Sequence, residues 1–205
     1  MSRKKSSGKK PAKKQGKNNS LRIIAGEWRG RRLSFPAHTM VRPTGDRVRE
    51  TVFNWLQPYV SGASVLDLFA GSGAMGLEAL SRGAQSATFI ERDARLVQAI
   101  KQNLATLKAS ATVLTAELPQ WLTQAQGCWD LVFLDPPYPA GLWLPCLQAL
   151  SKGCLNKGAL IYTEQPANKA PLNLPQDFVM LKERKAGQVR FMLLQYTPVN
   201  ETALT

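Results

Sequence analysis

Between residues 64 and 164, short runs of apolar residues alternate with longer amphipathic segments. The apolar runs cover residues 65–69, 87–91, 111–115, 131–135 and 159–164. Residues 131–134 are unbroken apolar, as expected for a strand that is buried on both faces of a parallel sheet. Helical periodicity is found at residues 74–82, 97–107 and 141–151. The alternation of strand and helix predicts an α/β fold with a mostly parallel, doubly wound sheet and helices on both faces.

The segments on either side of this region have different patterns. Residues 178–184 and 189–196, joined through Ala186 and Gly187, indicate an antiparallel hairpin at the end of the chain. Residues 21–35 alternate between apolar and polar or basic, with Gly26 and Gly30 flanking a turn, and predict an N-terminal β-hairpin. Apolar residues at helical spacing from Val48 to Leu56 predict an amphipathic helix between that hairpin and the first strand of the sheet.

Charge divides the chain further. The formal net charge is +13, and the first 19 residues carry eight lysines and arginines with no acid. This composition is typical of a disordered tail. Such a tail can add affinity for a polyanion without sequence preference, although a solvated tail with no specific role is equally consistent with it. We therefore divide the chain into a basic tail (residues 1–19), a hairpin extension (20–40), the main domain (41–199) and a C-terminal tail (200–205).

Composition also excludes several classes of protein. The chain has three cysteines and one histidine, so no zinc cluster can be built at ordinary spacing, and we expect no metal. No apolar run reaches the roughly 18 residues that a membrane helix needs. The basic N-terminus lacks the apolar core of a secretory signal, so we expect a cytoplasmic protein.

A glycine loop follows the first strand of the sheet. The spacing Gly71-x-Gly73-x-x-Gly76 leads into a helix, and Glu91 ends the next strand. Glycines let the backbone approach a ligand, and an acid in that position receives ribose hydroxyls, so the pattern is typical of nucleoside binding. By itself it is also compatible with an NAD-dependent enzyme. Asp67, four residues before Gly71, instead favours a ligand that carries an amino group.

A second motif, Asp135-Pro136-Pro137-Tyr138, follows the buried run 131–134. Two prolines keep the backbone extended, so a carboxylate and rigid carbonyls are presented at the carboxyl end of a strand, where open α/β sheets bind ligands. These acceptors suit a substrate with an exocyclic amino group, and Tyr138 offers a ring on which a planar base can stack. In the doubly wound order this strand neighbours the first, so both motifs are expected to face one crevice.

Basic residues precede the sheet and suggest a nucleic-acid partner. On the expected hairpin, Arg22, Arg29, Arg31 and Arg32 are interleaved with aromatic residues, which suits nucleic acid, although a charged edge strand gives the same pattern. Arg42, Arg47 and Arg49 crowd the start of the following helix, where cations oppose the helix dipole. They indicate a bound anion or solvated arginines. We assign Arg22, Arg29, Arg31, Arg32, Arg42, Thr44 and Arg47 to substrate binding.

Taken together, these motifs resemble a known family. Asp67-Leu68-Phe69-Ala70-Gly71-Ser72-Gly73 with the Asp135-Pro136-Pro137-Tyr138 motif resembles class I S-adenosylmethionine-dependent methyltransferases that act on exocyclic amino groups. The segment from Arg42-Pro43-Thr44 to Leu56, the opening from Arg22 and the Gly187-Gln188-Val189 turn resemble the RsmD family. These are bacterial methyltransferases that modify guanine N2 in small-subunit (16S) ribosomal RNA. The resemblance runs from about residue 21 to residue 196.

The resemblance implies a seven-stranded Rossmann-like sheet with an antiparallel C-terminal hairpin, and S-adenosylmethionine as cofactor. It also implies a monomer that acts on the assembled small subunit. It assigns catalysis to Asp135, Pro136, Pro137 and Tyr138. It assigns cofactor binding to Asp67, Phe69, Ala70, Gly71, Ser72, Gly73, Glu91, Arg92, Glu117 and Leu118. One departure is Ala116-Glu117-Leu118, because many relatives have Asp or Asn there, facing the adenine.

Three other functions share part of the pattern. A DNA adenine-N6 or cytosine-N4 methyltransferase would use the same tetrapeptide, although 205 residues leave little room for a separate target-recognition region. An NAD-dependent oxidoreductase would explain the glycine loop but not the tetrapeptide. A non-catalytic RNA-binding module would explain the basic residues and leave both strand-end motifs without a role.

Overall fold

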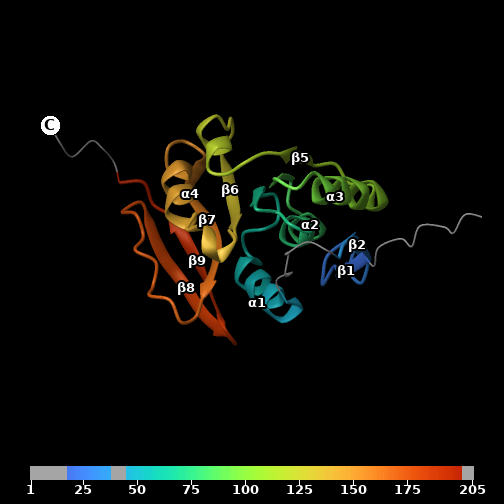
Figure 1. Ribbon diagram of the computed structural model, residues 1–205, viewed down its shortest axis with the longest axis horizontal. Coiled ribbons are helices and arrows are strands. Elements are labelled where there is room, and N and C mark those ends of the chain that lie inside the picture. Colours follow the sequence, from blue (N-terminus) through green and yellow to red (C-terminus); the bar gives the residue numbers. More distant parts are fainter. Residues whose placement is uncertain (1–17, 38–44, 200–205) are drawn as a thin grey trace, which may run out of the picture.

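The computed structural model describes residues 18–37 and 45–199. The assignments to Arg42 and Thr44, most of the basic tail and the C-terminal tail lie outside these residues. The fold is a seven-stranded sheet with an additional two-stranded sheet near the N-terminus (Figure 1). No helix in the described part of the chain is long and apolar enough to cross a membrane.

The large sheet has the strand order β5-β4-β3-β6-β7-β9-β8. Its members are β3 (Ser64–Leu68), β4 (Ser86–Glu91), β5 (Thr112–Thr115), β6 (Trp129–Leu134), β7 (Leu155–Pro166), β8 (Phe178–Ala186) and β9 (Val189–Tyr196). The strands from β5 to β7 are parallel, and β9 pairs antiparallel with both β7 and β8. The prediction of a doubly wound sheet ending in an antiparallel hairpin is confirmed.

Helices cover both faces of the sheet, as the alternation of strands and helices predicts. They are α1 (Asp46–Leu56), α2 (Ala74–Ser81), α3 (Ala94–Leu107) and α4 (Trp143–Leu150), with short 3-10 turns η1 (Gln120–Thr123) and η2 (Tyr138–Ala140). Side chains of α1, α2 and α3 share one core cluster with Phe89 and Phe133, whereas those of α4 share a second cluster with Val132 and Leu134. Neighbouring residues of β6 therefore point into opposite cores.

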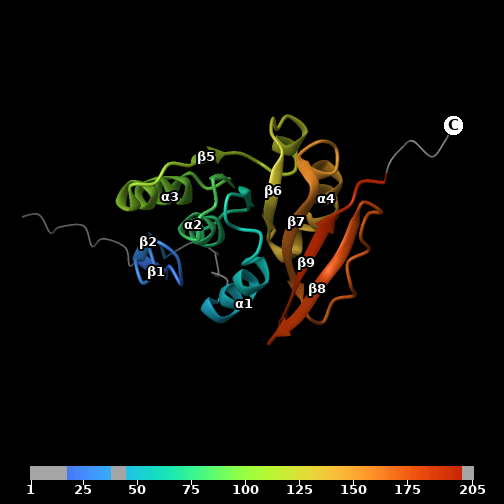
Figure 2. The same ribbon diagram turned by 180° about the vertical axis from the view of Figure 1, so that it is seen from behind.

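The N-terminal hairpin packs on the outer side of the helical layer, next to α2 and α3 (Figures 1 and 2). It consists of β1 (Asn18–Arg22) and β2 (Arg32–Pro36), paired antiparallel with Leu21 opposite Leu33. Its connection is fixed to the end of α2, because Glu27 N–H donates to the Ser81 carbonyl at 2.7 Å. Gly26 has φ +83°, and a Cβ there would lie 1.8 Å from that carbonyl oxygen. No other residue type allows so close an approach.

A buried ionic cluster holds α1, α2 and the hairpin together. Glu78 of α2 accepts N–H bonds from Ile24 (2.8 Å) and Ala25 (3.0 Å) and from Nε of Arg82 (2.8 Å). Arg49 of α1 has 1% exposure, lies 3.8 Å from Glu78 and donates to Asp46 at 2.6 Å. Arg49 is one of the arginines at the start of α1 that suggested a bound anion, and it has a structural role instead. Its charge is balanced by carboxylates within the protein.

Candidate active site

The two motifs singled out in the sequence lie side by side. In the parallel pairing of β3 with β6, Asp67 is opposite Phe133 and Leu68 is opposite Leu134. The next residues, Phe69 and Asp135, therefore leave the sheet together at its carboxyl edge. On the other side of β3, Glu91 ends β4 at the same edge. The expectation that the glycine loop and the tetrapeptide meet at one edge agrees with this register.

The glycine loop has the backbone geometry that its sequence requires. Gly71 and Gly73 have φ values of +55° and +76°, and the loop tightens through the Gly73 N–H, which donates to the Ala70 carbonyl at 2.7 Å. Helix α2 begins directly afterwards at Ala74. A Cβ at Gly76 would lie 2.3 Å from the Phe89 ring, so this glycine is needed for helix–sheet packing. Ser72 is buried at 3% exposure within the loop.

Glu91 connects two loops at this edge. One of its carboxylate oxygens accepts the Gly71 N–H and the other accepts the Asp93 N–H, each at 2.8 Å. Its position beside the glycine loop agrees with the predicted ribose-binding role, which stays a prediction. Arg92, the next residue, is exposed.

Asp67 lies beneath the glycine loop with 3% exposure, and its Oδ2 accepts the Gly76 N–H at 2.9 Å. Burial raises the pKa of Asp67 to about 8; the Gly76 N–H opposes this shift and the charge of Glu91 adds to it. A carboxylate that is costly to ionise favours a cationic ligand nearby, because the cation would stabilise its charged form.

Asp135 is half-buried, and Pro136 after it is buried. The pKa of Asp135 is raised well above its ordinary value by burial, and the charges of Glu164 and Asp67 add to the shift. Tyr138, in η2, is 39% exposed and stacks on Trp143 of α4, with ring centroids 6.0 Å apart and planes at 21°. The tetrapeptide thus combines a carboxylate of raised pKa with a partly exposed tyrosine ring that packs on Trp143.

One neighbour of Asp135, Glu164, was not assigned from the sequence. Leu134 is opposite Thr163 in the β6–β7 pairing, so Glu164 is the residue beside Asp135. Glu164 has 5% exposure, accepts a short hydrogen bond from the Tyr162 hydroxyl, and its backbone carbonyl accepts Trp143 Nε1–H at 2.8 Å. The signal was available, because Glu164 ends an apolar run just as Glu91 does.

The remaining predicted site residues lie on several separate elements. After β5, Glu117 is exposed and Leu118 is buried at 8% exposure in the α4-side core. Arg29, Arg31 and Arg32 are exposed on the hairpin, in the layer outside α2 and α3, and Arg47 is exposed on α1. Arg22 forms a 3.3 Å ion pair with Asp46. The structure therefore does not gather these arginines around Asp135.

Metal binding has no evident site in the described residues. No group of three or more His, Cys, Asp or Glu side chains within residues 18–37 and 45–199 could hold a metal ion.

The sheet order, the glycine loop after β3 and the Asp-Pro-Pro-Tyr motif after β6 define a Rossmann-like class I methyltransferase fold. A family model described as "Conserved hypothetical protein 95" matches residues 21–195. The chain belongs to this family, the RsmD family, which confirms the resemblance seen in the sequence.

The chain matches named relatives over most of their length. The chain is 45% identical over 180 residues to "Ribosomal RNA small subunit methyltransferase D" of Escherichia coli strain K12, covering 87% of this chain and 91% of the relative. It is 46% identical over 184 residues to the protein of the same name from Haemophilus influenzae, covering 85% and 93%.

Solved structures agree with this assignment. "Putative methyltransferase yhhF" from Escherichia coli aligns with a TM-score of 0.82 and 45% identity, over 87% of this chain and 99% of that chain. The Thermus thermophilus 16S rRNA N2 G1207 methyltransferase RsmC, in complex with AdoMet and guanosine, aligns with a TM-score of 0.63 and 21% identity. That alignment covers 89% of this chain and 50% of RsmC, and shows a shared fold.

Proposed function

We propose that this protein transfers a methyl group from S-adenosylmethionine to the exocyclic N2 of a guanine in small-subunit (16S) ribosomal RNA. The observation that carries the proposal is the register of β3 and β6, which puts the glycine loop and Asp135 at one edge of the sheet. The names of the relatives support the RNA substrate. The resemblance to the RsmD family further favours the assembled small subunit as substrate and a monomeric enzyme.

The residues at this edge fit S-adenosylmethionine. Residues 69–73 form a loop whose backbone a ligand can approach closely, and Asp67 beneath it suits the amino group of the methionine part. Glu91 is placed to receive the ribose hydroxyls, and Leu118 with Glu117 to border the adenine. The bound cofactor supplies an electrophilic methyl group on a positively charged sulfur.

The tetrapeptide fits the exocyclic amine of a guanine. The lone pair of N2 is delocalised into the ring, so the nitrogen is a poor nucleophile. Asp135 and the Pro136 carbonyl can accept its two N–H bonds, which favours a pyramidal nitrogen aimed at the methyl group. A guanine turned out of its stack would lie against Tyr138, which Trp143 supports.

The raised pKa of Asp135 suits the removal of a proton from N2 after methyl transfer. As the N–C bond forms and the C–S bond breaks, N2 carries one proton more than the product needs. A carboxylate whose charge is disfavoured by burial and by Glu164 is a stronger base than an ordinary aspartate, so Asp135 can take up that proton. The proton then passes to solvent when the product leaves.

The test is methyl transfer from labelled S-adenosylmethionine to unmodified small ribosomal subunits, to their naked RNA and to duplex DNA in parallel. We expect label in N2-methylguanosine, and the ratio of subunit to naked RNA shows which form is recognised. Label in DNA as methyladenine or methylcytosine would overturn the RNA assignment in favour of a DNA methyltransferase. Label in a different RNA nucleoside would overturn the N2 assignment alone.

A further inference from the structure

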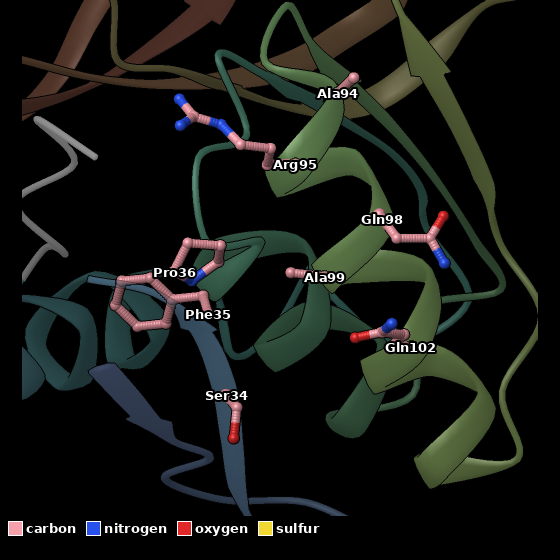
Figure 3. A pocket seen from close by; sticks show the side chains of 8 residues that line it. All are labelled: Ser34, Phe35, Pro36, Ala94, Arg95, Gln98, Ala99 and Gln102. Carbon is pink, nitrogen blue, oxygen red and sulfur yellow. The ribbon is translucent and has the colours of Figure 1, made fainter. Parts of the chain in front are cut away.

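A groove of about 470 Å³ lies between β2 and the first half of α3 (Figure 3). The β2 side of the groove is formed by Ser34, Phe35 and Pro36, and the α3 side by Ala94, Arg95, Gln98, Ala99 and Gln102. Figure 3 shows Arg95 extending away from the start of α3, above Pro36 in this view, and Ala99 facing β2. The volume is within the range of about 300–1,000 Å³ that is usual for small-ligand sites.

This groove is separate from the crevice at the strand ends. In a helix each residue advances by about 100°, so Arg95, Ala99 and Gln102 lie on the face opposite Val97 and Leu104. Val97 and Leu104 belong to the core cluster that packs on the sheet, and Ala99 joins the same cluster where α3 meets β2. The groove therefore lies on the side of α3 that faces β2. Its upper end nevertheless begins at Ala94, three residues after Glu91, and so it reaches the rim of the candidate active site.

The two segments that form the groove are rich in cations. Arg95 lines the groove, and residues 27–36 and 92–102 contain five further exposed cations: Arg29, Arg31, Arg32, Arg92 and Lys101. The same segments contain two carboxylates, Glu27 and Asp93, and Asp93 is bound by Arg95 at 2.6 Å. A surface of this charge attracts a polyanion.

The groove has a fixed wall. Asn103 Nδ2 donates to the Ser34 carbonyl at 3.1 Å, which ties β2 to α3. The hairpin is also bound to α2 through Glu78 and through Ser81, whose hydroxyl donates to the Ala25 carbonyl at 2.6 Å. A site built between anchored elements needs little ordering when a ligand binds.

We propose that the groove between β2 and α3 binds an unpaired nucleotide of the RNA substrate, separate from the target base. The inference rests on the proposed function. Pro36, which is partly exposed above the buried Phe35 and Ala99, suits the face of a base, and the amides of Gln98 and Gln102 can donate to and accept from its edge. Arg95, oriented by Asp93, is placed for the adjoining phosphate.

The experiment uses the full chain and the RNA substrate that the wild-type enzyme methylates. In the variant Gln98→Ala/Gln102→Ala we expect KM for RNA to rise about tenfold, with kcat at saturating RNA and the affinity for S-adenosylmethionine unchanged. Its matched control is Gln124→Ala/Gln148→Ala, which removes two exposed glutamines from the α4 side of the molecule and should leave KM unchanged.

Salt dependence separates base contacts from phosphate contacts. Arg95→Ala should lower the slope of log KM against log salt by about one charge, whereas the glutamine double variant should keep the wild-type slope. As a second approach, Ala99→Leu adds volume to the floor of the groove. It should raise KM for RNA in a protein whose melting temperature shows that it is folded.

The experiment distinguishes a failure of the groove proposal from a failure of the proposed function. If the wild-type enzyme methylates RNA and the glutamine variant has an unchanged KM for RNA, the groove is not a nucleotide site and the proposed function stands. If the glutamine variant loses affinity for S-adenosylmethionine, the groove belongs to the cofactor and the inference is wrong. If the wild-type enzyme transfers no methyl group to any RNA, the proposed function and this inference both fail.

Discussion

The carboxylate under the N-terminal hairpin and the carboxylates at the strand ends have opposite surroundings. Glu78 has no exposure and accepts hydrogen bonds from Ile24, Ala25 and Arg82, with Arg49 3.8 Å away. Its charge is met by donors and cations that belong to the protein. This region binds the hairpin, α1 and α2 into one unit.

At the carboxyl edge of the sheet, Asp67, Asp135 and Glu164 lie near one another. The pKa of Asp135 is raised by burial and by both of the other carboxylates. Within residues 18–37 and 45–199, neither Asp67 nor Asp135 forms an ion pair. An arrangement that disfavours its own charge is characteristic of functional sites. The buried ion pairs of this chain therefore stabilise the fold, whereas Asp67 and Asp135, which form none among the described residues, are the carboxylates that we propose contact a ligand.

The largest effect that would separate the two regions is expected at Asp135. Asp135→Ala removes the proposed acceptor for the substrate amine, and we expect kcat to fall by about 100- to 1000-fold. The affinity for S-adenosylmethionine and the melting temperature should change little, because Asp135 makes no ion pair within the described residues. Near-wild-type turnover with intact cofactor binding would refute the catalytic assignment.

Glu78→Ala should have the reverse effect. It leaves Arg49 buried without its partner on α2, and breaking a buried ion pair in this way costs about 3–5 kcal/mol. We expect the melting temperature to fall by roughly 10 °C. Thermal unfolding measures the change, and Glu50→Ala, at an exposed position on α1, is the control. A fall at Asp135→Ala as large as that at Glu78→Ala would remove the distinction between the two regions.

We expect Asp67 to make cofactor binding depend on pH. With a pKa of about 8 in the free protein, Asp67 is mostly protonated near neutral pH and must ionise to hold an ammonium group. We therefore expect the affinity for S-adenosylmethionine to increase by up to about tenfold between about pH 6 and about pH 7. Calorimetric titration at several pH values measures it. In Asp67→Asn the affinity should be lower and nearly independent of pH.

The same shift has a consequence for stability without the cofactor. The folded state binds the Asp67 proton more tightly than the unfolded state does. This contribution is fully present below pH 3.8 and is lost progressively as the pH rises to about 8. In Asp67→Asn the free energy of unfolding should therefore fall less over this range, and an unchanged pH dependence would contradict the raised pKa.

The smallest expected effect is at Glu164. Glu164→Gln keeps an acceptor for Tyr162 and removes one of the charges that raise the pKa of Asp135. We expect the acidic limb of kcat against pH to move to lower pH by about one unit or less. The profile should keep its shape. A limb that moves to higher pH would mean that Glu164 does not act through Asp135.

Much of the fold follows from patterns that are local in the sequence. The unbroken apolar run 131–134 predicts that β6 is buried on both faces, and the alternation of strands and helices predicts that β3 is parallel to it. The turn residues after both strands mark the carboxyl edge. For that reason the candidate site could be located from Gly71, Gly73 and Asp135 alone. Glu91 was found by the same logic, because it too ends a buried strand.

What the sequence could not show depends on long-range pairing. Arg49 looks like the exposed arginines near it, and its burial follows from contacts with Arg22 and Glu78, which are distant in the chain. The position of Glu164 beside Asp135 depends on the β6–β7 register, and the groove on α3 exists because β2 packs against it. No periodicity within one segment specifies such contacts.

The attachment of the hairpin to α2 also sets an order of folding. Ile24 and Glu78 are 54 residues apart, and Ala25 and Ser81 are 56 apart. During synthesis the hairpin emerges before α2, so these backbone groups have no acceptor until the whole of α2 has followed. The chain must close this long loop before its N-terminal strands gain their support, so we expect the hairpin to become protected from hydrogen exchange late, together with α2. The hairpin, although it is made before α2, is thus expected to become ordered no earlier than α2.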